Sequence, residues 1–325
     1  MKNWQKYILL FTIFILLVGC IIGIYIAMAS SKSVWQPRQF TVSGGTPCLL
    51  QDGQVWRYTG EKHWEQIPLS QSVKQLLPGE TLWVVLQDGR LYTPEPPVIE
   101  ESMPLTGAFY TEMALQLLEI SKTQPFSQIS GNPFYWDVLV LLPDGTLLSL
   151  QADTYSPYAL GEKAIAVSGR YVLTEQGNLY YLEENGTSSF CIHDKGGITA
   201  ITTDVFDHTA CLALTDDGRV LSFGRDWQRN PYDGSTMLAW TSLPTEDWHH
   251  VTTVAQGHDF AAGVTEQGKI VFTGTLPAKS LAEIQKELSD WRHIVSIAAY
   301  NTQLYGLQSD GKCICLELEP FLFNQ

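Results

Sequence analysis

Basic side chains are scarce in this sequence. Its 325 residues include 20 Lys and Arg against 34 Asp and Glu, so the formal net charge is −14 at pH 7. Beyond Met28 the chain keeps 34 acidic and 18 basic side chains, and its formal charge there is −16. Such an acidic excess repels nucleic-acid phosphates and disfavours adhesion to an anionic membrane surface. The composition therefore predicts that nucleic acid is not a partner.

The short motifs of common catalytic and cofactor sites are absent as well. The sequence has no His-Glu-x-x-His and no Cys-x-x-Cys, the usual zinc spacings. It also has no Gly-x-Ser-x-Gly turn, no phosphate-binding glycine loop and no dinucleotide fingerprint. We therefore expect neither a metal nor a cofactor, and no motif points to a catalytic residue.

Cysteine is also rare, with six residues in the whole chain. Five of them lie beyond the apolar amino terminus: Cys48, Cys191, Cys211, Cys313 and Cys315. An odd number leaves at least one thiol unpaired in an oxidising compartment. Cys313 and Cys315 stand two apart on one predicted strand, which is too far for an easy bridge. We interpret all five as small apolar strand residues.

One uninterrupted apolar run is present at the amino terminus. Residues 7–28 carry no charge over 22 positions and read YILLFTIFILLVGCIIGIYIAM. About 20 apolar residues span the hydrocarbon core of a bilayer, and a cleaved signal peptide has a shorter run. The segment therefore predicts an uncleaved transmembrane signal anchor, with a short cytoplasmic tail at 1–6 and a linker at 29–37.

The residues around this run indicate its orientation in the membrane and whether it is cleaved. Lys2, Lys6 and the amino group favour a cytoplasmic tail, which puts the rest of the chain on the extracytoplasmic side of the cell membrane. Residues 17–20 read LVGC and offer an alternative, because they resemble a bacterial lipobox whose cysteine becomes lipidated. The apolar residues that continue after Cys20 favour the signal anchor over the lipoprotein.

A short phrase recurs seven times along the remaining chain: an apolar run, then Asp-Gly or Gln-Gly, then a second apolar run. Such a phrase predicts a tight β-hairpin, because glycine adopts the positive φ that the turn requires. Gln176 and Gln267 precede two of the glycines, and we expect slightly longer loops there. The apolar residues four before and two after each glycine are predicted to be buried. The aligned glycines are Gly53, Gly89, Gly145, Gly177, Gly218, Gly268 and Gly311.

The spacing of these hairpins predicts the architecture. Successive glycines are 36, 56, 32, 41, 50 and 43 residues apart, a period typical of propellers or solenoids. Further apolar segments, such as 164–169 and 294–300, give about four strands per unit, which favours radially arranged sheets. The sequence therefore predicts an all-β, seven-bladed propeller of four-stranded antiparallel blades over 38–325. We also expect the carboxyl-terminal segment 315–323 to complete the first blade.

Three stretches resemble regulator-of-chromosome-condensation repeats, whose pattern is apolar strand, Gly, His-Ser/Thr, apolar strand, Asp-Gly, apolar strand. They read ITTDVFDHTACLALTDDGRVLSFG, HHVTTVAQGHDFAAGVTEQGKIVFTG and HIVSIAAYNTQLYGLQSDGKCICLE. The resemblance covers about residues 38–325 and implies a seven-bladed propeller, here a membrane-anchored and bacterial one. The Trp-Gly and Gln-Leu-Gly blade ends of the family are missing, so the resemblance implies no particular partner.

One segment carries the candidate binding residues. Residues 224–240, GRDWQRNPYDGSTMLAW, are interpreted as a loop after the fifth hairpin. Aromatic and arginine side chains dominate recognition hot spots, so we predict that Trp227, Arg229, Tyr232 and Trp240 contact a partner. The alternative is that one or two of these tryptophans pack between blades.

Other polar and apolar patterns are interpreted as structural. His208 and His258 each stand ten residues before a repeat glycine, and a repeated position favours a repeated hydrogen bond over one catalytic centre. Residues 109–122 show an apolar helical stripe, which we expect to pack on a blade rather than to dock a partner. Ser280 and Glu283 form a capping box that predicts a short helix.

Together these features predict a membrane-tethered, extracytoplasmic propeller that recognises a protein or an envelope polymer through loops on one face. Two alternatives stay open. The first is an enzyme, such as a lyase, hydrolase or quinone-dependent oxidoreductase, with a site in the central channel. The second is a structural subunit of an envelope complex. A channel lined by clustered His, Arg and carboxylate groups would favour the enzyme, and an aromatic-rimmed face would favour binding.

Overall fold

A computed structural model describes residues 39–79, 81–94, 105–131, 138–151, 154–158, 160–183, 189–204, 210–229, 236–274 and 279–318. The chain divides into two compact units, Met1–Trp35 and Gln36–Gln325, and every described residue belongs to the second. The predicted span 7–28, its tail 1–6 and the linker 29–37 lie outside the described residues. None of the described helices is long and apolar enough to cross a membrane.

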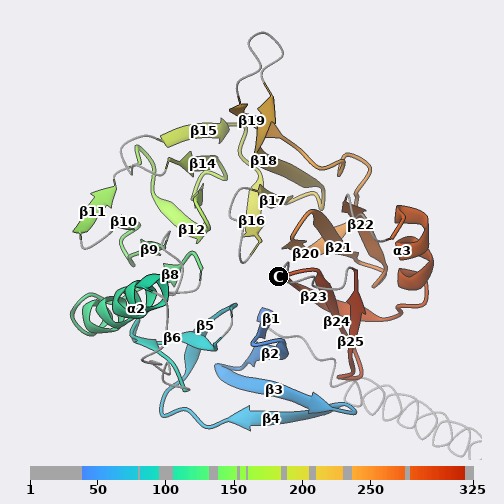
Figure 1. The fold of residues 1–325 in the computed structure, drawn as a ribbon, viewed down its shortest axis with the longest axis horizontal. Helices are drawn as coiled ribbons and strands as arrows, with labels where there is room; N and C mark the ends of the chain where they lie inside the picture. The colour runs from blue at the N-terminus through green and yellow to red at the C-terminus, as the bar shows by residue number, and fades with distance from the viewer. Residues whose placement is uncertain are drawn as a thin grey trace, which may run out of the picture. The chain divides into compact units, whose positions relative to one another are not determined.

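The described strands form seven antiparallel sheets, numbered sheets 1 to 7 in chain order (Figure 1). Sheet 1 holds β1 (Gln39–Ser43), β2 (Thr46–Gln51), β3 (Gln54–Gly60) and β4 (His63–Ile67). Sheet 2 holds β5 (Val73–Leu77), β6 (Trp83–Leu86) and β7 (Leu91–Tyr92). Sheet 3 holds β8 (Gln128–Ile129), β9 (Leu139–Leu141), β10 (Leu147–Gln151) and β11 (Thr154–Tyr158). Sheet 4 holds β12 (Ala164–Ser168), β13 (Tyr171–Thr174), β14 (Leu179–Leu182) and β15 (Ser189–His193).

The remaining three sheets follow the same order, in which each strand pairs with the next along the chain. Sheet 5 holds β16 (Ile198–Thr203), β17 (Ala210–Thr215), β18 (Val220–Arg229) and β19 (Thr236–Thr241). Sheet 6 holds β20 (Val251–Gly257), β21 (Phe260–Thr265) and β22 (Ile270–Gly274). Sheet 7 holds β23 (Ile294–Tyr300), β24 (Gln303–Gln308) and β25 (Cys313–Glu317). The strand pattern predicted from the sequence is confirmed, although three sheets show three strands instead of four in the described residues.

All seven repeat glycines lie in hairpin turns with φ between +70° and +91°. Six of the turns share two backbone hydrogen bonds: the glycine N–H donates to the carbonyl three residues before it, and the N–H of that same residue donates to the carbonyl of the residue after the glycine. For example, Gly177 N donates to Thr174 O (2.9 Å) and Thr174 N donates to Asn178 O (3.0 Å). The two turns with Gln before Gly share this geometry with the Asp turns, so the predicted longer loops there are wrong. Only the glycine needs positive φ in such a turn, and Gln is tolerated before it. Asp52 alone among the residues before these glycines has positive φ, at 52°.

The same glycines also join neighbouring sheets. Gly53 O accepts a hydrogen bond from Val73 N at the start of β5 (2.8 Å), and Gly218 O accepts one from Val251 N at the start of β20 (2.9 Å). Equivalent bonds link Gly89 to Phe126, Gly177 to Ile198 and Gly268 to Ile294. Each innermost strand therefore starts beside the turn of the preceding sheet. All these strands consequently run in one direction.

The hydrophobic core lies between neighbouring sheets. Cys48 and Leu50 of sheet 1 pack with Val84 and Leu86 of sheet 2, and similar clusters join sheets 3 and 4, sheets 4 and 5, and sheets 5 and 6. Because both faces of each sheet are buried against neighbouring sheets, apolar residues recur at the same positions before and after each repeat glycine. The innermost strands contact one another around a ring: β1 with β5, β8 with β12, β12 with β16, β16 with β20, β20 with β23, and β23 with β1.

Glutamine side chains connect the innermost strands of sheets 1 to 4. The Gln39 amide donates to Leu76 O (2.6 Å) and accepts from Leu76 N (2.8 Å). In the same way Gln75 bonds both backbone groups of Ile129, at 2.9 and 3.0 Å. A third glutamine, Gln128, bonds both backbone groups of Val167, at 3.1 Å each. We call these three contacts the glutamine bridges.

The ring closes between sheet 7 and sheet 1 through side chains. The buried indole N–H of Trp64, on β4, donates to Gly311 O (2.8 Å), and Lys62 forms an ion pair with Asp310. Sheet 1 takes all four strands from residues 39–67, and β25 pairs with β24 of sheet 7. The expectation that the carboxyl-terminal segment 315–323 completes the first blade is therefore wrong for its described residues 315–318, and residues 319–323 lie outside the described residues. Residues 39–43 already supply the innermost strand that the prediction overlooked.

Two helices pack against three-stranded sheets. Helix α2 (Leu105–Thr123) contacts β7 and buries Leu117 in a cluster with Trp83 and Phe126. Helix α3 (Leu281–Leu288) contacts β22, buries Ile284 and Leu288, and begins with the predicted capping box of Ser280 and Glu283. Each helix contacts the third strand of its sheet, and Figure 1 shows α3 beside β22. Both predictions, of a packed stripe and of a short helix, are confirmed, except that Leu281 is exposed.

Candidate functional site

The segment predicted as a loop is a two-stranded arm. Strand β18 pairs with the described residues of β17 from Val220 to Gly224, and with β19 from Gly224 to Arg229. The loop interpretation of residues 224–240 is therefore wrong where the structure describes them. The turn-forming residues in this stretch hid the strand pair. We call residues 225–229 and 236–241 the β18–β19 arm.

The strand register orders the candidate binding residues along this arm. Arg225 pairs with Trp240, Trp227 pairs with Leu238, and Arg229 pairs with Thr236. Residues two apart on a strand occupy the same face, and directly paired residues share it. Trp227, Arg229 and Trp240 therefore hold positions on one face of the arm. The fourth predicted residue, Tyr232, lies outside the described residues.

The ring encloses an axial cavity of about 500 Å³. Its described lining comes from the innermost strand of every sheet, which are the strands that surround the centre in Figure 1. A cavity of this size falls within the range of small-ligand sites. Sheets that radiate from a shared axial cavity, each beginning at its innermost strand, define the fold as a β-propeller.

The lining of this cavity is mostly small, amide or hydroxyl-bearing. Asp204 is the one charged residue among the described lining residues, and no His, Lys or Arg accompanies it there. The clustered His, Arg and carboxylate groups that would favour an enzyme are therefore not seen in the described lining. The described residues also hold no group of three or more metal-ligating side chains. The geometry supports no particular reaction.

His258 lies at the rim of the cavity and contacts both neighbouring sheets. Its backbone N–H donates to Asn301 O of sheet 7 (3.2 Å), and its Nδ1 is 3.8 Å from Asp204 Oδ2 of sheet 5. Its Nε2 is 3.4 Å from Asp259 Oδ2. These contacts fit the structural role expected for this histidine. The second histidine of the pattern, His208, lies outside the described residues.

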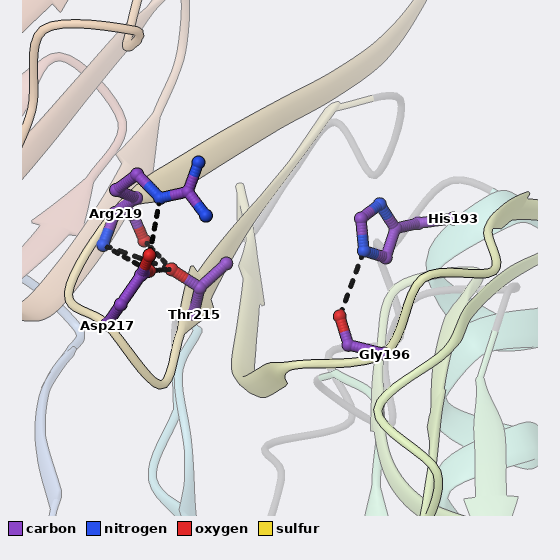
Figure 2. A network of polar contacts seen from close by, with 5 residues as sticks. All are labelled: His193, Gly196, Thr215, Asp217 and Arg219. Atoms are coloured by element: carbon purple, nitrogen blue, oxygen red, sulfur yellow. Dashed lines mark hydrogen bonds and ion pairs between the residues drawn. The ribbon is translucent and has the colours of Figure 1, made fainter.

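On the opposite face, carboxylates stabilise the repeat turns. Figure 2 shows the turn of β17 and β18, where the Thr215 hydroxyl donates to Asp217 (2.5 Å) and Arg219 Nε donates to the same carboxylate (2.7 Å). These bonds, with that of Thr215 the strongest, hold the pKa of Asp217 below its usual range. Across from this turn, His193 Nε2 lies 3.1 Å from Gly196 O (Figure 2). The polar groups here satisfy one another, and the arrangement is structural.

A second carboxylate network was not visible in the sequence. Glu162 accepts hydrogen bonds from Thr174 (2.7 Å), Asn178 (3.0 Å) and Tyr180 (3.0 Å), which together lower its pKa. Burial and the bond to Glu162 raise the pKa of Tyr180 to about 12. Asn178 also accepts from Gly196 N (3.2 Å), which ties sheet 4 to the start of sheet 5. No spacing rule relates Glu162 to these partners, so pattern analysis had no signal for it.

The five cysteines divide by exposure. Cys48 and Cys211 are fully buried, whereas Cys191 and Cys315 are exposed and Cys313 is intermediate. Burial raises the pKa of Cys211 and raises that of Cys313 to about 12. Thiols with raised pKa values are poor nucleophiles. These two positions fit the interpretation as small apolar strand residues.

No protein-family model matches the chain, and a search of curated proteins finds no match. Among solved structures, human WBSCR16 aligns with a TM-score of 0.45 and 13% identity, over 83% of this chain and 86% of the other. Yeast RCC1 (Prp20), solved bound to Kap60, aligns with a TM-score of 0.40 and 14% identity, over 85% and 69%. BamB from Moraxella catarrhalis gives 0.39 and 12%, over 85% and 81%. Likenesses this low support no statement about function.

Proposed function

We propose that this chain is a membrane-tethered, seven-bladed propeller that binds a protein or an envelope polymer on the extracytoplasmic side. The seven sheets of 39–318 would be its blades, within a propeller spanning 38–325. The apolar segment 7–28 would be its signal anchor, and the repeats would be of the regulator-of-chromosome-condensation type. Support for the anchor comes from the length of the uncharged run. Support for the blades comes from the seven sheets around one cavity.

The observation that carries the binding function is the β18–β19 arm. Its residues 225–229 pair with β19 and extend beyond Gly224, where the pairing with the described part of β17 ends. Two-stranded ribbons gain stability in water from contacts with other segments or with a partner. Its register gathers two tryptophans and an arginine, the side chains most enriched at hot spots. We expect a partner to bind against this face of the arm.

A photo-crosslinking experiment tests this proposal. A benzoyl-phenylalanine placed at Trp227 of the full-length protein, in its native membranes, is expected to give discrete adducts on irradiation. The Arg229→Ala substitution should reduce the yield of those adducts, because it removes a neighbouring contact on the same face of the arm. The adducts are identified by mass spectrometry.

The matched control uses Phe190, an exposed aromatic on β15, the outermost strand of sheet 4. The same crosslinker at this position should give no such adducts. Equal adducts at positions 190 and 227, or adducts at 227 that are indifferent to Arg229→Ala, would contradict the proposal.

A further inference from the structure

Glutamine bridges connect the innermost strands of sheets 1 to 4, but among the described residues none connects sheet 4 to sheet 5 or sheet 5 to sheet 6. In each bridge one side-chain amide bonds both the N–H and the C=O of a single residue on the next strand: Leu76, Ile129 or Val167. These backbone groups face away from the residue's own sheet. The bridges therefore show that a primary carboxamide fits this edge of an innermost strand.

A β-bulge near the start of the strand aligns the innermost strands of sheets 2, 4, 5 and 6 with one another. The pairing shifts by one residue directly before Gln75, Ala166, Ala200 and Thr253. The next residue is Leu76 in sheet 2 and Val167 in sheet 4, and both accept a glutamine bridge. The equivalent residues are Ile201 in sheet 5 and Val254 in sheet 6.

Ile201 and Val254 receive no such bridge from the chain. The positions that would bridge to them hold Ala166 and Ala200, whose methyl groups are too short and carry no polar atom. Among the described residues, no hydrogen bond links the N–H or the C=O of Ile201 or Val254 to a neighbouring sheet. Both residues are half-buried and line the axial cavity. Their strands, β16 and β20, contact each other, so two equivalent edges face the cavity side by side.

The surroundings of these two edges suit an uncharged group that has both donors and acceptors. The lining residues next to them in the sequence, Thr202 and Thr253, carry no charge. The hydroxyls of Ser168 and Thr203 bond each other at 3.0 Å. A carboxylate has no donor and an ammonium group has no acceptor, whereas a primary carboxamide has both. A carboxamide can therefore bond the N–H and the C=O of one residue at the same time.

We propose that the inner edges of sheets 5 and 6 bind primary carboxamide groups of a ligand, at the backbone of Ile201 and Val254. Each carboxamide makes the pair of hydrogen bonds that a bridging glutamine makes on sheets 2, 3 and 4. The cavity volume of about 500 Å³ leaves room for such a ligand. The group belongs either to a small free amide or to a glutamine side chain of a protein segment. This inference is independent of the β18–β19 arm.

Nuclear magnetic resonance of the full-length protein in detergent, with isotope-labelled isoleucine and valine, tests the proposal. The probe is propionamide, which reproduces the end of a glutamine side chain. Its control is N,N-dimethylpropionamide, which keeps the carbonyl but has no N–H. Propionamide should shift the amide signals of Ile201 and Val254 saturably, and its control should not. The signals of Ile129 and Val167 should stay in place, because their N–H groups already donate to a glutamine.

A pair of peptides identifies the source of the carboxamide. Gly-Gln-Gly-Gln-Gly and Gly-Met-Gly-Met-Gly share a backbone and a side-chain length, and only the first carries side-chain carboxamides. Binding of the glutamine peptide at least about tenfold tighter than that of propionamide indicates a protein segment, because linked groups bind together. Binding that is no tighter than that of propionamide indicates a small free amide.

Glutamine supplied by the chain itself gives a second test. The double variant Ala166→Gln with Ala200→Gln should bridge to Ile201 and Val254, raise the urea midpoint and abolish the response to propionamide. Ala166→Met with Ala200→Met is the control of matched length without an amide, and should raise the midpoint less. The proposal is overturned if propionamide leaves both signals in place, if either control compound shifts them equally, if the glutamine variant still responds, or if methionine stabilises as much as glutamine.

Discussion

At the scale of single residues, the repeat glycines have two separate functions. Positive φ is needed to close each hairpin, and absence of a side chain is needed where the next sheet approaches. A Cβ atom at Gly89 would lie 2.6 Å from Pro125 Cβ, and one at Gly177 would lie 2.6 Å from Gly197 N. The sequence pattern predicted the first function. The second depends on a strand that arrives from further along the chain.

A pair of alanine substitutions separates these functions. Gly177 and Gly45 have φ values of +78° and +71°, but a Cβ at Gly45 meets nothing within 4 Å. Gly45→Ala should cost about 1 kcal/mol of unfolding free energy, from backbone strain alone. Gly177→Ala should cost about 1–3 kcal/mol more, because its Cβ overlaps the next sheet. Urea denaturation measures both, and equal losses would show that the contact between sheets adds nothing.

The apolar residues at fixed positions before and after each repeat glycine show what a sequence pattern can predict. Alternation predicted burial of the residues four before and two after each glycine, and most of them are buried. The residue directly after each glycine is polar, a type usually found exposed, yet Asn178 is only 9% exposed. Asn178 is buried because it bonds Glu162 and Gly196. The exception arises from partners that the local pattern does not contain.

At the scale of elements, the innermost strands are held together by side chains as well as by packing. The three glutamine bridges span sequence separations of 37, 54 and 39 residues. Each satisfies both the N–H and the C=O of a residue on the next innermost strand, whose groups face away from its own sheet. Such a bridge replaces water on an otherwise unpaired strand edge.

Removal of one bridge should therefore destabilise the ring locally. We expect Gln75→Ala to lower the unfolding free energy by about 1–3 kcal/mol, since it leaves two backbone groups of Ile129 unsatisfied. The amide of Ile129, which donates to Gln75 Oε1 at 3.0 Å, should also exchange with deuterium faster. Gln54→Ala, at an exposed residue of β3, is the control and should change neither quantity. An unaltered Ile129 exchange rate would show that the bridge is not formed in solution.

Helix α3 was predictable from its sequence, whereas the strands of the β18–β19 arm were not. Helix α3 was predictable because a capping box and an amphipathic stripe are both local signals. The β18–β19 arm was misread because Gly, Asn, Pro and Asp cluster in the same stretch as its strands, and such residues usually mark loops. Cross-strand pairing decides the conformation there, and pairing is not a local property.

At the scale of the whole molecule, closure joins residues at the two ends of the fold. The Trp64 indole bonds Gly311, which lies 247 residues away. Among the described residues no backbone N–H bonds to the Gly311 carbonyl, and the indole takes the place that this donor has at Gly53 or Gly218. The carbonyl is thereby satisfied in the same way at every glycine turn for which such a bond is described.

Trp64→Phe should weaken closure by about 1–3 kcal/mol, because it leaves a buried carbonyl without its donor. The loss of stability is measured as the shift in the urea midpoint of the full-length protein. Lys62→Ala is the control: its ion pair with Asp310 is about half exposed on both sides, so its loss should cost about 0–1 kcal/mol. A loss for Lys62→Ala as large as that for Trp64→Phe would contradict this ranking.

The proposed location of the molecule is open to a direct labelling test. Cys191 and Cys315 are exposed, so a membrane-impermeant maleimide should label them in intact cells if the propeller lies outside the cytoplasm. Protein that carries Cys191→Ser, Cys313→Ser and Cys315→Ser should lose this label, because Cys48 and Cys211 are buried. Labelling that appears only after the cells are permeabilised would place the propeller in the cytoplasm and overturn the proposed topology.

The sequence by itself determined the seven hairpins, the buried columns beside them and the short capped helix, since each depends on backbone φ or on alternation within a few residues. Only the tertiary structure decided the glutamine bridges, the closure through Trp64, the length of the β18–β19 arm and the approach of His258 to Asp204. These contacts join residues tens to hundreds of positions apart. These contacts form because seven sheets are arranged around one axis. A pattern read along the sequence does not show which strands become neighbours.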